Sequence, residues 1–108
     1  MDKHRILDEI HAQLIRATFL GCKTDEGRLM LATVVQGISD AMGLYNSAFE
    51  KVYIEHEGNA RGKRKFITRQ EEANQWFKSK GHYPFCDLIN LEASWVTHLL
   101  KTKAGVNV

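Results

Sequence analysis

A single proline among 108 residues, Pro84, is the feature that most restricts what this chain can fold into. Proline and glycine supply the turns between strands, and a many-stranded sandwich or barrel needs them at short, regular intervals. Only eight glycines accompany the proline, so long helices are the expected elements. The length is that of one domain with one core. We therefore predict a mainly α protein, a small single-domain helical bundle over residues 1–108.

Apolar residues recur every three or four positions in five segments, as one face of an α-helix requires. The expected helices cover about residues 3–20, 25–43, 69–80, 84–90 and 92–102. The second is apolar around most of its circumference, so we expect it to be central and buried, with Gly37 allowing close helix approach. No stretch reaches the roughly 18 apolar residues of a membrane helix, and no membrane partner is expected.

Local signals indicate where several of these helices begin and end. Gly21 and Gly81 follow the last periodic residues of two helices, where a left-handed backbone costs least in glycine, and are expected to stop them. Thr24 is expected to cap the second helix. Thr68 and Glu71 have the spacing of a capping box at the start of the third.

The pattern changes between Tyr45 and Ile67. Val52 and Ile54 alternate with polar or amphipathic residues, and a glycine-containing segment separates them from residues 65–67. This pattern predicts a short β-hairpin at about 51–67. The alternative is a helix over 46–57 followed by a basic loop, and the sequence leaves both open.

Positive charge is concentrated in the second half of the chain. Residues 55–108 carry nine Lys and Arg against six Asp and Glu, whereas residues 1–54 carry six against seven. A polyanion would meet the protein in the basic half. The expected phosphate contacts are Arg61, Lys63, Arg64, Lys65, Arg69, Lys78 and Lys80.

Residues 82–101 meet the steric demands of a helix-turn-helix, two short helices crossing through a tight turn. Pro84 suits the first turn of the first helix, and Asn90 tolerates the positive φ of the connection. Leu91 is expected to point inward. The apolar anchors of the first helix are expected at Phe85, Cys86, Leu88 and Ile89. The outward positions of the second helix, expected to contact bases, are Ser94, Thr97, His98 and Lys101.

The same region resembles a known group of sequences. Residues 71–77, which include an Ala-x-x-Trp helix, and residues 83–96, with an Ile-Asn-Leu-Glu-Ala turn, resemble the C-terminal part of small uncharacterised phage and prophage proteins with a helix-turn-helix-like segment. The resemblance covers about residues 70–100. It implies a phage or mobile-element origin, and hence the host cytoplasm. Asn90 stands where that group has Gly, and Thr97 and His98 where it often has Arg.

Enzyme activity, a cofactor and a metal site are not expected. His82 and Cys86 have the i, i+4 spacing of two ligands on one helix face, but no Cys-x-x-Cys pair and no fourth ligand accompany them. Glu55, His56 and Glu57 lack a nucleophile or pocket nearby. The two cysteines, Cys22 and Cys86, are far apart and are expected to be free thiols in a reducing cytoplasm.

Two functions remain open at the sequence level. The first is a small DNA-binding regulator of transcription that reads double-stranded DNA with its second crossed helix, as a homodimer because one short helix makes few contacts. The second is a non-catalytic protein-interaction module, such as a phage-encoded inhibitor or adaptor of a host complex. The turn pattern and the basic cluster favour the first function, and near-neutral net charge with an outward Trp95 favours the second.

Overall fold

The computed structural model describes residues 2–18, 23–45, 48–53 and 63–108, with backbone alone for 48–53 and 63–66. The described chain forms five helices and one two-stranded sheet, so the mainly α prediction is confirmed. In chain order the elements are α1 (Lys3–Ala17), α2 (Asp25–Ala41), β1 (Ala48–Tyr53), β2 (Lys63–Thr68), α3 (Arg69–Lys78), α4 (Tyr83–Leu88) and α5 (Ala93–Lys103).

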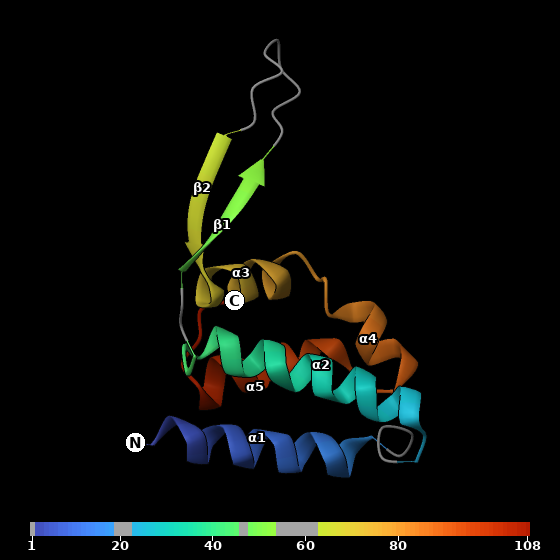
Figure 1. Ribbon diagram of the computed structural model, residues 1–108. Coiled ribbons are helices and arrows are strands. Elements are labelled where there is room, and N and C mark those ends of the chain that lie inside the picture. Colours follow the sequence, from blue (N-terminus) through green and yellow to red (C-terminus); the bar gives the residue numbers. More distant parts are fainter. Residues whose placement is uncertain (1, 19–22, 46–47, 54–62) are drawn as a thin grey trace.

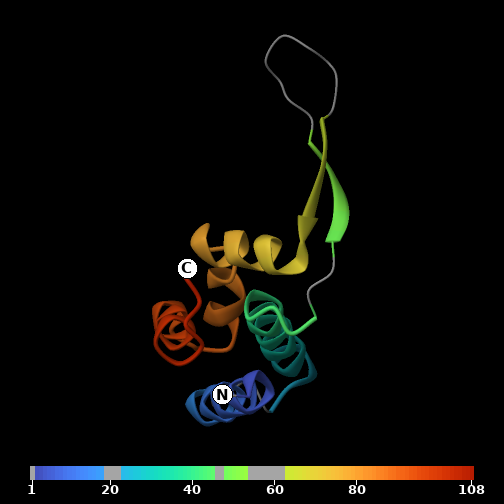
Figure 2. The same ribbon diagram turned by 90° about the vertical axis from the view of Figure 1, so that its left-hand side faces the viewer.

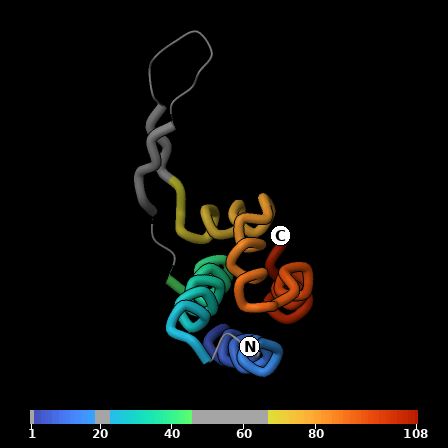
Figure 3. The backbone as a smooth tube through the Cα atoms, turned by 90° about the vertical axis from the view of Figure 1, so that its right-hand side faces the viewer, coloured from blue at the N-terminus to red at the C-terminus, as the bar shows by residue number. Residues whose placement is uncertain are grey.

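The helices pack around one hydrophobic core to which all five contribute. Helix α2 packs against α3 and α4, and α1 packs against α5 and α2. The two side views show α2 and α5 on opposite sides of the helical body, with α1 along one end (Figure 2, Figure 3). The outer faces of α2 and α5 therefore point away from each other.

Burial follows the expected stripe on α1 but not on α2. Ile10 and Leu14 of α1 are fully buried, as are Val34 and Ile38 of α2. Leu29 of α2, however, is 63% exposed. The expected central position of α2 agrees with its contacts to α1, α3 and α4, but its burial is limited to the side that these helices cover.

The hairpin prediction is confirmed, and the helix alternative is wrong for the residues of β1. Strands β1 and β2 pair antiparallel, from Ala48 opposite Thr68 to Tyr53 opposite Lys63. The two strands project away from the helices (Figure 1). The segment that joins them, 54–62, lies outside the described residues. Because Thr68 directly precedes α3, β2 runs into that helix without a linker.

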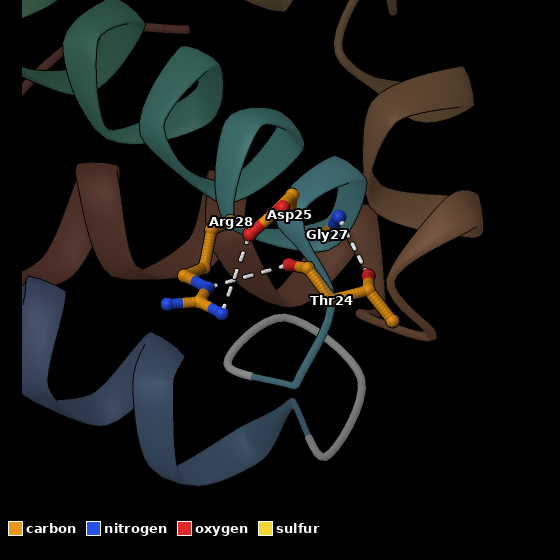
Figure 4. A network of polar contacts seen from close by, with 4 residues as sticks. All are labelled: Thr24, Asp25, Gly27 and Arg28. Carbon is orange, nitrogen blue, oxygen red and sulfur yellow. Dashed lines mark hydrogen bonds and ion pairs between the residues drawn. The ribbon is translucent and has the colours of Figure 1, made fainter.

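The predicted helix starts are present with their capping bonds. The Thr24 hydroxyl accepts a hydrogen bond from the Gly27 amide at 2.9 Å, and Arg28 Nη2 lies 3.4 Å from the Asp25 carboxylate (Figure 4). At the start of α3 the Thr68 hydroxyl accepts from the Glu71 amide at 3.1 Å. Each cap satisfies a backbone donor that the first helical turn leaves without a partner.

Three helix ends are closed by the same backbone motif. After α2, α3 and α4 the chain makes one hydrogen bond spanning five residues and one spanning three around a left-handed residue, which is the Schellman pattern. The left-handed residues are Gly43, Lys80 and Asn90, with φ of 76°, 63° and 55°. The expected positive φ of Asn90 is thus confirmed.

Gly81 does not stop α3 in the way the sequence suggested. Lys80 takes the left-handed conformation, and Gly81 is needed for space instead. A Cβ on Gly81 would lie 2.3 Å from Trp76 Cδ1, and one on Gly37 would lie 2.6 Å from Trp76 Cζ3. Both glycines let the indole of Trp76 approach the backbone, so they are explained by packing.

Helix α1 ends earlier than expected, at Ala17 instead of about residue 20. The next residue, Thr18, has extended φ and ψ and is buried. Its hydroxyl donates a hydrogen bond to the carbonyl of Ile89, at the end of α4. A tertiary contact therefore accompanies the end of the helix, and the expected stop at Gly21 lies outside the described residues.

The turn at Asn90 allows a direct test of its left-handed backbone. We expect Asn90→Val to lower the free energy of unfolding by about 1–2 kcal/mol, because a β-branched side chain is strained at positive φ. Asn90→Gly should equal or slightly exceed the wild type. Urea denaturation followed by circular dichroism measures both values. Asn107→Val, at an exposed position, is the control, and an equal loss there would contradict the explanation.

Candidate nucleic-acid interface

Helices α4 and α5 are joined by four residues and cross through the left-handed turn at Asn90. The Leu91 amide bonds the Cys86 carbonyl at 2.9 Å, and Leu91 itself is buried as expected. Cys86 and Ile89 are buried anchors, but Leu88 is 66% exposed, so its prediction as an anchor was wrong. Because Cys86 of α4 and Ile89, which follows the helix, both point inward, position 88 falls on the outer side.

A buried histidine ties the turn after α3 to the first turn of α5. His82 is 1% exposed, and its Nε2 lies 3.3 Å from the Ala93 carbonyl oxygen and 3.2 Å from Thr97 Oγ1. Its ring packs against those of Phe77 and Tyr83, with centroids 4.8 and 5.0 Å away. These contacts fix the position of α5 relative to the end of α3.

Burial lowers the pKa of His82 below its ordinary value, because a charged ring is disfavoured away from water. The hydrogen bond to the Ala93 carbonyl acts in the opposite direction and is the weaker effect. The ring is therefore neutral near pH 7. A neutral ring whose Nε2–H donates to Ala93 leaves Nδ1 as an acceptor, and this atom is buried without a hydrogen-bond partner.

A depression of about 410 Å³ lies between the turn that follows α3 and the outer face of α5, and Thr97, which contacts this histidine, is one of its lining residues. It brings together residues that the sequence analysis assigned to two different roles. The expected base contacts and two of the expected phosphate contacts line it together. They are Lys78, Lys80, Ser94, Thr97, His98 and Lys101.

The expected base contacts on α5 differ in exposure and in whether their side chains already make hydrogen bonds within the protein. His98 and Lys101 are exposed. Ser94 is also exposed, but its hydroxyl donates to the Glu92 carboxylate at 2.9 Å. Thr97 is half-buried, and its hydroxyl donates to the Ala93 carbonyl at 3.2 Å. Two of the four side chains are thus already engaged within the protein.

The two lysines of the α3 end are both exposed and flank the depression. The Nζ atom of Lys80 lies 5.6 Å from the ring centroid of Tyr83, within cation–π range. Phe77 and Tyr83 also line the depression, and sequence reasoning missed them as site residues. Their helical spacing indicated core packing, and only the fold shows that they border an open surface.

The other expected phosphate contacts are not part of this site. Arg69 is exposed and lines a different groove, between α2 and α3. Lys63, Arg64 and Lys65 lie on β2, where the structure describes only the backbone. Arg61 lies outside the described residues. Of the basic residues described, Lys63, Arg64 and Lys65 therefore belong to the hairpin, and Arg69 belongs to α3 but lines another groove.

Cys86 lies in the core, where burial, with a smaller contribution from the Asp87 charge, raises the pKa of its thiol to about 11. Such a thiol is unreactive as a nucleophile at neutral pH. Within the described part of the chain, no three His, Cys, Asp or Glu side chains are grouped as a metal site would require. Cys22 lies outside that part.

The depressed pKa of His82 predicts how stability changes with pH. Below a pH of about 6.5 the unfolded chain binds a proton on this residue while the folded chain does not, so the free energy of unfolding should fall as the pH drops. Above that value this contribution should be constant. We expect the loss of stability between pH 7.5 and 5.5, measured by urea denaturation, to be smaller in His82→Gln than in the wild type. His98→Gln, which removes an exposed imidazole, is the matched control. An unchanged loss in His82→Gln would refute the assignment.

Comparisons with family models, with curated proteins and with solved structures found no match to this chain. In the ranges that the structure describes, no helix has both the length and the apolar character needed to cross a membrane.

Proposed function

We propose that this chain binds double-stranded DNA as a small helix-turn-helix protein, with α5 as the helix that enters the major groove. One observation carries the proposal: six residues suited to base or phosphate contact line one depression on the outer face of α5. Among the described residues that line it there is no Asp or Glu. A duplex approaching this face would meet three ammonium groups, with the Glu92 carboxylate beside them on the Ser94 hydroxyl.

The turn geometry supports the same proposal. Asn90 holds a left-handed φ between two helices whose inward residues are buried, as the steric demands of a helix-turn-helix require. His82 then fixes α5 against the end of α3. In this arrangement His98 and Lys101 would contact base edges, while Lys78 and Lys80 would bind the phosphates of the adjacent DNA backbone. The basic residues of β2, on the projecting hairpin, would add a second backbone contact.

Lysine substitutions test this proposal through the salt dependence of binding. We expect the Lys78→Ala, Lys101→Ala double variant to bind a random-sequence duplex more weakly. The slope of log affinity against log salt should become shallower by about two units, because each lost phosphate contact removes roughly 0.9. Replacing Lys63, Arg64 and Lys65 with Ala should flatten it by about three. Fluorescence anisotropy at several salt concentrations measures both slopes.

Lys3→Ala is the matched control for charge, because Lys3 is exposed at the start of α1 and does not line the depression. Its salt slope should equal that of the wild type. Absence of duplex binding by the native protein at low salt would end the proposal.

A second candidate function is supported by the opposite face of the molecule. Two mainly apolar grooves flank α2, one shared with α3 and one with α1, and Ala32 and Gln36 line both. Ile15 at the α1 groove is 40% exposed, and Leu29 and Tyr45 are also exposed. Large exposed apolar side chains beside grooves are typical of protein docking surfaces. Trp95, in contrast, is half-buried against the core, so it no longer supports this function.

The position of this face favours a different protein over a second copy as the partner. A two-fold dimer through α2 would direct the two α5 helices away from each other. They would then be unable to enter adjacent major grooves on one side of a duplex. A homodimer that reads DNA must therefore pair through another surface.

Capture from host lysate tests the second function. We expect the wild type and the Lys78→Ala, Lys101→Ala variant to retain the same stoichiometric partner, and Ala32→Glu to lose it, because a charge at Ala32 enters both grooves. Quantitative mass spectrometry of the eluates measures the molar ratio of captured partner to this chain. Recovery of no stoichiometric partner by the wild type would exclude this function.

A further inference from the structure

The depression on α5, called the recess below, is an open surface hollow whose lining combines charged, polar and apolar side chains. Its volume is about 410 Å³, and its lining comes from the end of α3, the start of α4, α5 and the C-terminal segment. Pockets for small organic ligands occupy roughly 300–1,000 Å³. The volume of the recess is therefore within the range that holds one nucleotide-sized molecule.

The charges that line the recess suit a dianion. Lys78 and Lys80 approach from the α3 end, and Lys101 from α5. A phosphate monoester presents three terminal oxygens and up to two negative charges, whereas each backbone phosphate of DNA is a diester with one charge. Three ammonium groups from two directions outnumber the Glu92 carboxylate, which is bonded to the lining Ser94, and they match the monoester better.

The hydroxyl of Thr97 can become a donor to such a ligand without leaving a buried group unpaired. It now donates to the Ala93 carbonyl. The same carbonyl has a second donor, His82 Nε2, at 3.3 Å. If Thr97 turned toward the recess, His82 would keep the Ala93 carbonyl satisfied. His82 would thus let the Thr97 hydroxyl bind a ligand without leaving the buried Ala93 carbonyl unpaired.

The remaining lining is apolar or aromatic and would face the organic part of an ester. Phe77 and Tyr83 supply this surface. Lys80 Nζ lies over the Tyr83 ring at 5.6 Å, so one ammonium group is held at the edge of the recess. Lys80 is also one of two non-glycine residues with positive φ in the described chain. Strained backbone of this kind concentrates at ligand sites.

We propose that the recess between the α3 end and α5 binds a phosphate monoester of nucleotide size. The proposal deepens the DNA-binding function. It rests on that function in one respect: it predicts that such a ligand and a duplex compete for the same lysines. The monoester has two sources with the same chemistry, a free nucleotide and the phosphorylated 5′ end of a nucleic acid.

Titration of the ¹⁵N-labelled full chain with adenosine 5′-monophosphate at low salt tests the proposal. We expect saturable shifts of the backbone amides of residues 78–82 and 94–101, and no such shifts with adenosine, which lacks the phosphate. The Lys78→Ala, Lys101→Ala variant should bind about tenfold more weakly, because it loses two charge-assisted contacts. Lys103→Ala removes an exposed charge from α5 that lines a different depression, and it should match the wild type within about twofold.

A second arm compares duplexes with and without a 5′-phosphate by anisotropy. Tighter binding of the phosphorylated duplex that disappears in the double variant supports the inference and identifies the nucleic-acid end as the source. If adenosine 5′-monophosphate does not saturate these amides and the 5′-phosphate changes nothing, the inference is overturned, while duplex binding itself would still stand. Saturable nucleotide binding without any duplex binding would support the recess and reject the proposed function.

Discussion

The direction of α5 depends on the backbone at Asn90 and on His82, the buried histidine that contacts the first turn of α5. A left-handed residue at this point turns the chain after α4, and the bond from the Leu91 amide to the Cys86 carbonyl closes that turn. His82 then links the end of α3 to Ala93 and Thr97. Without both constraints Lys78 and Lys101 would not line the same recess. The candidate site therefore depends on the turn at Asn90 and on the buried His82, although neither residue lines the recess.

Features that depend on neighbouring residues in sequence could be predicted, and features that depend on distant packing could not. Thr24, Thr68 and Asn90 act through backbone groups a few residues away, so their spacing alone indicated their roles. Leu88 and Leu29 are exposed because the core closes on the other side of α4 and α2. Apolar character alone does not show which side that is.

The polar residues of the candidate site were predictable from the sequence, but its aromatic residues and the grouping of its parts were not. Helical periodicity placed Ser94, Thr97, His98 and Lys101 on the outer face of α5, and all four line the recess. The end of α3 had been assigned to phosphate contact by charge alone, and no sequence pattern indicated that it would lie beside α5. The long-range link is His82, whose role is invisible in sequence because it is a lone histidine with no partner at helical spacing other than Cys86.

Lys80 shows where local backbone preference and the candidate site conflict. The equivalent positions after α2 and α4 carry glycine and asparagine, the residues that tolerate positive φ best, whereas α3 ends with lysine at φ 63°. A glycine at position 80 would relieve strain of about 1 kcal/mol but would remove an ammonium group from the recess. Gly81 is not the left-handed residue. It is a glycine because a side chain at this position would collide with Trp76. Proteins that otherwise follow local rules depart from them most often at functional sites, which is why this strained lysine supports a ligand at this surface.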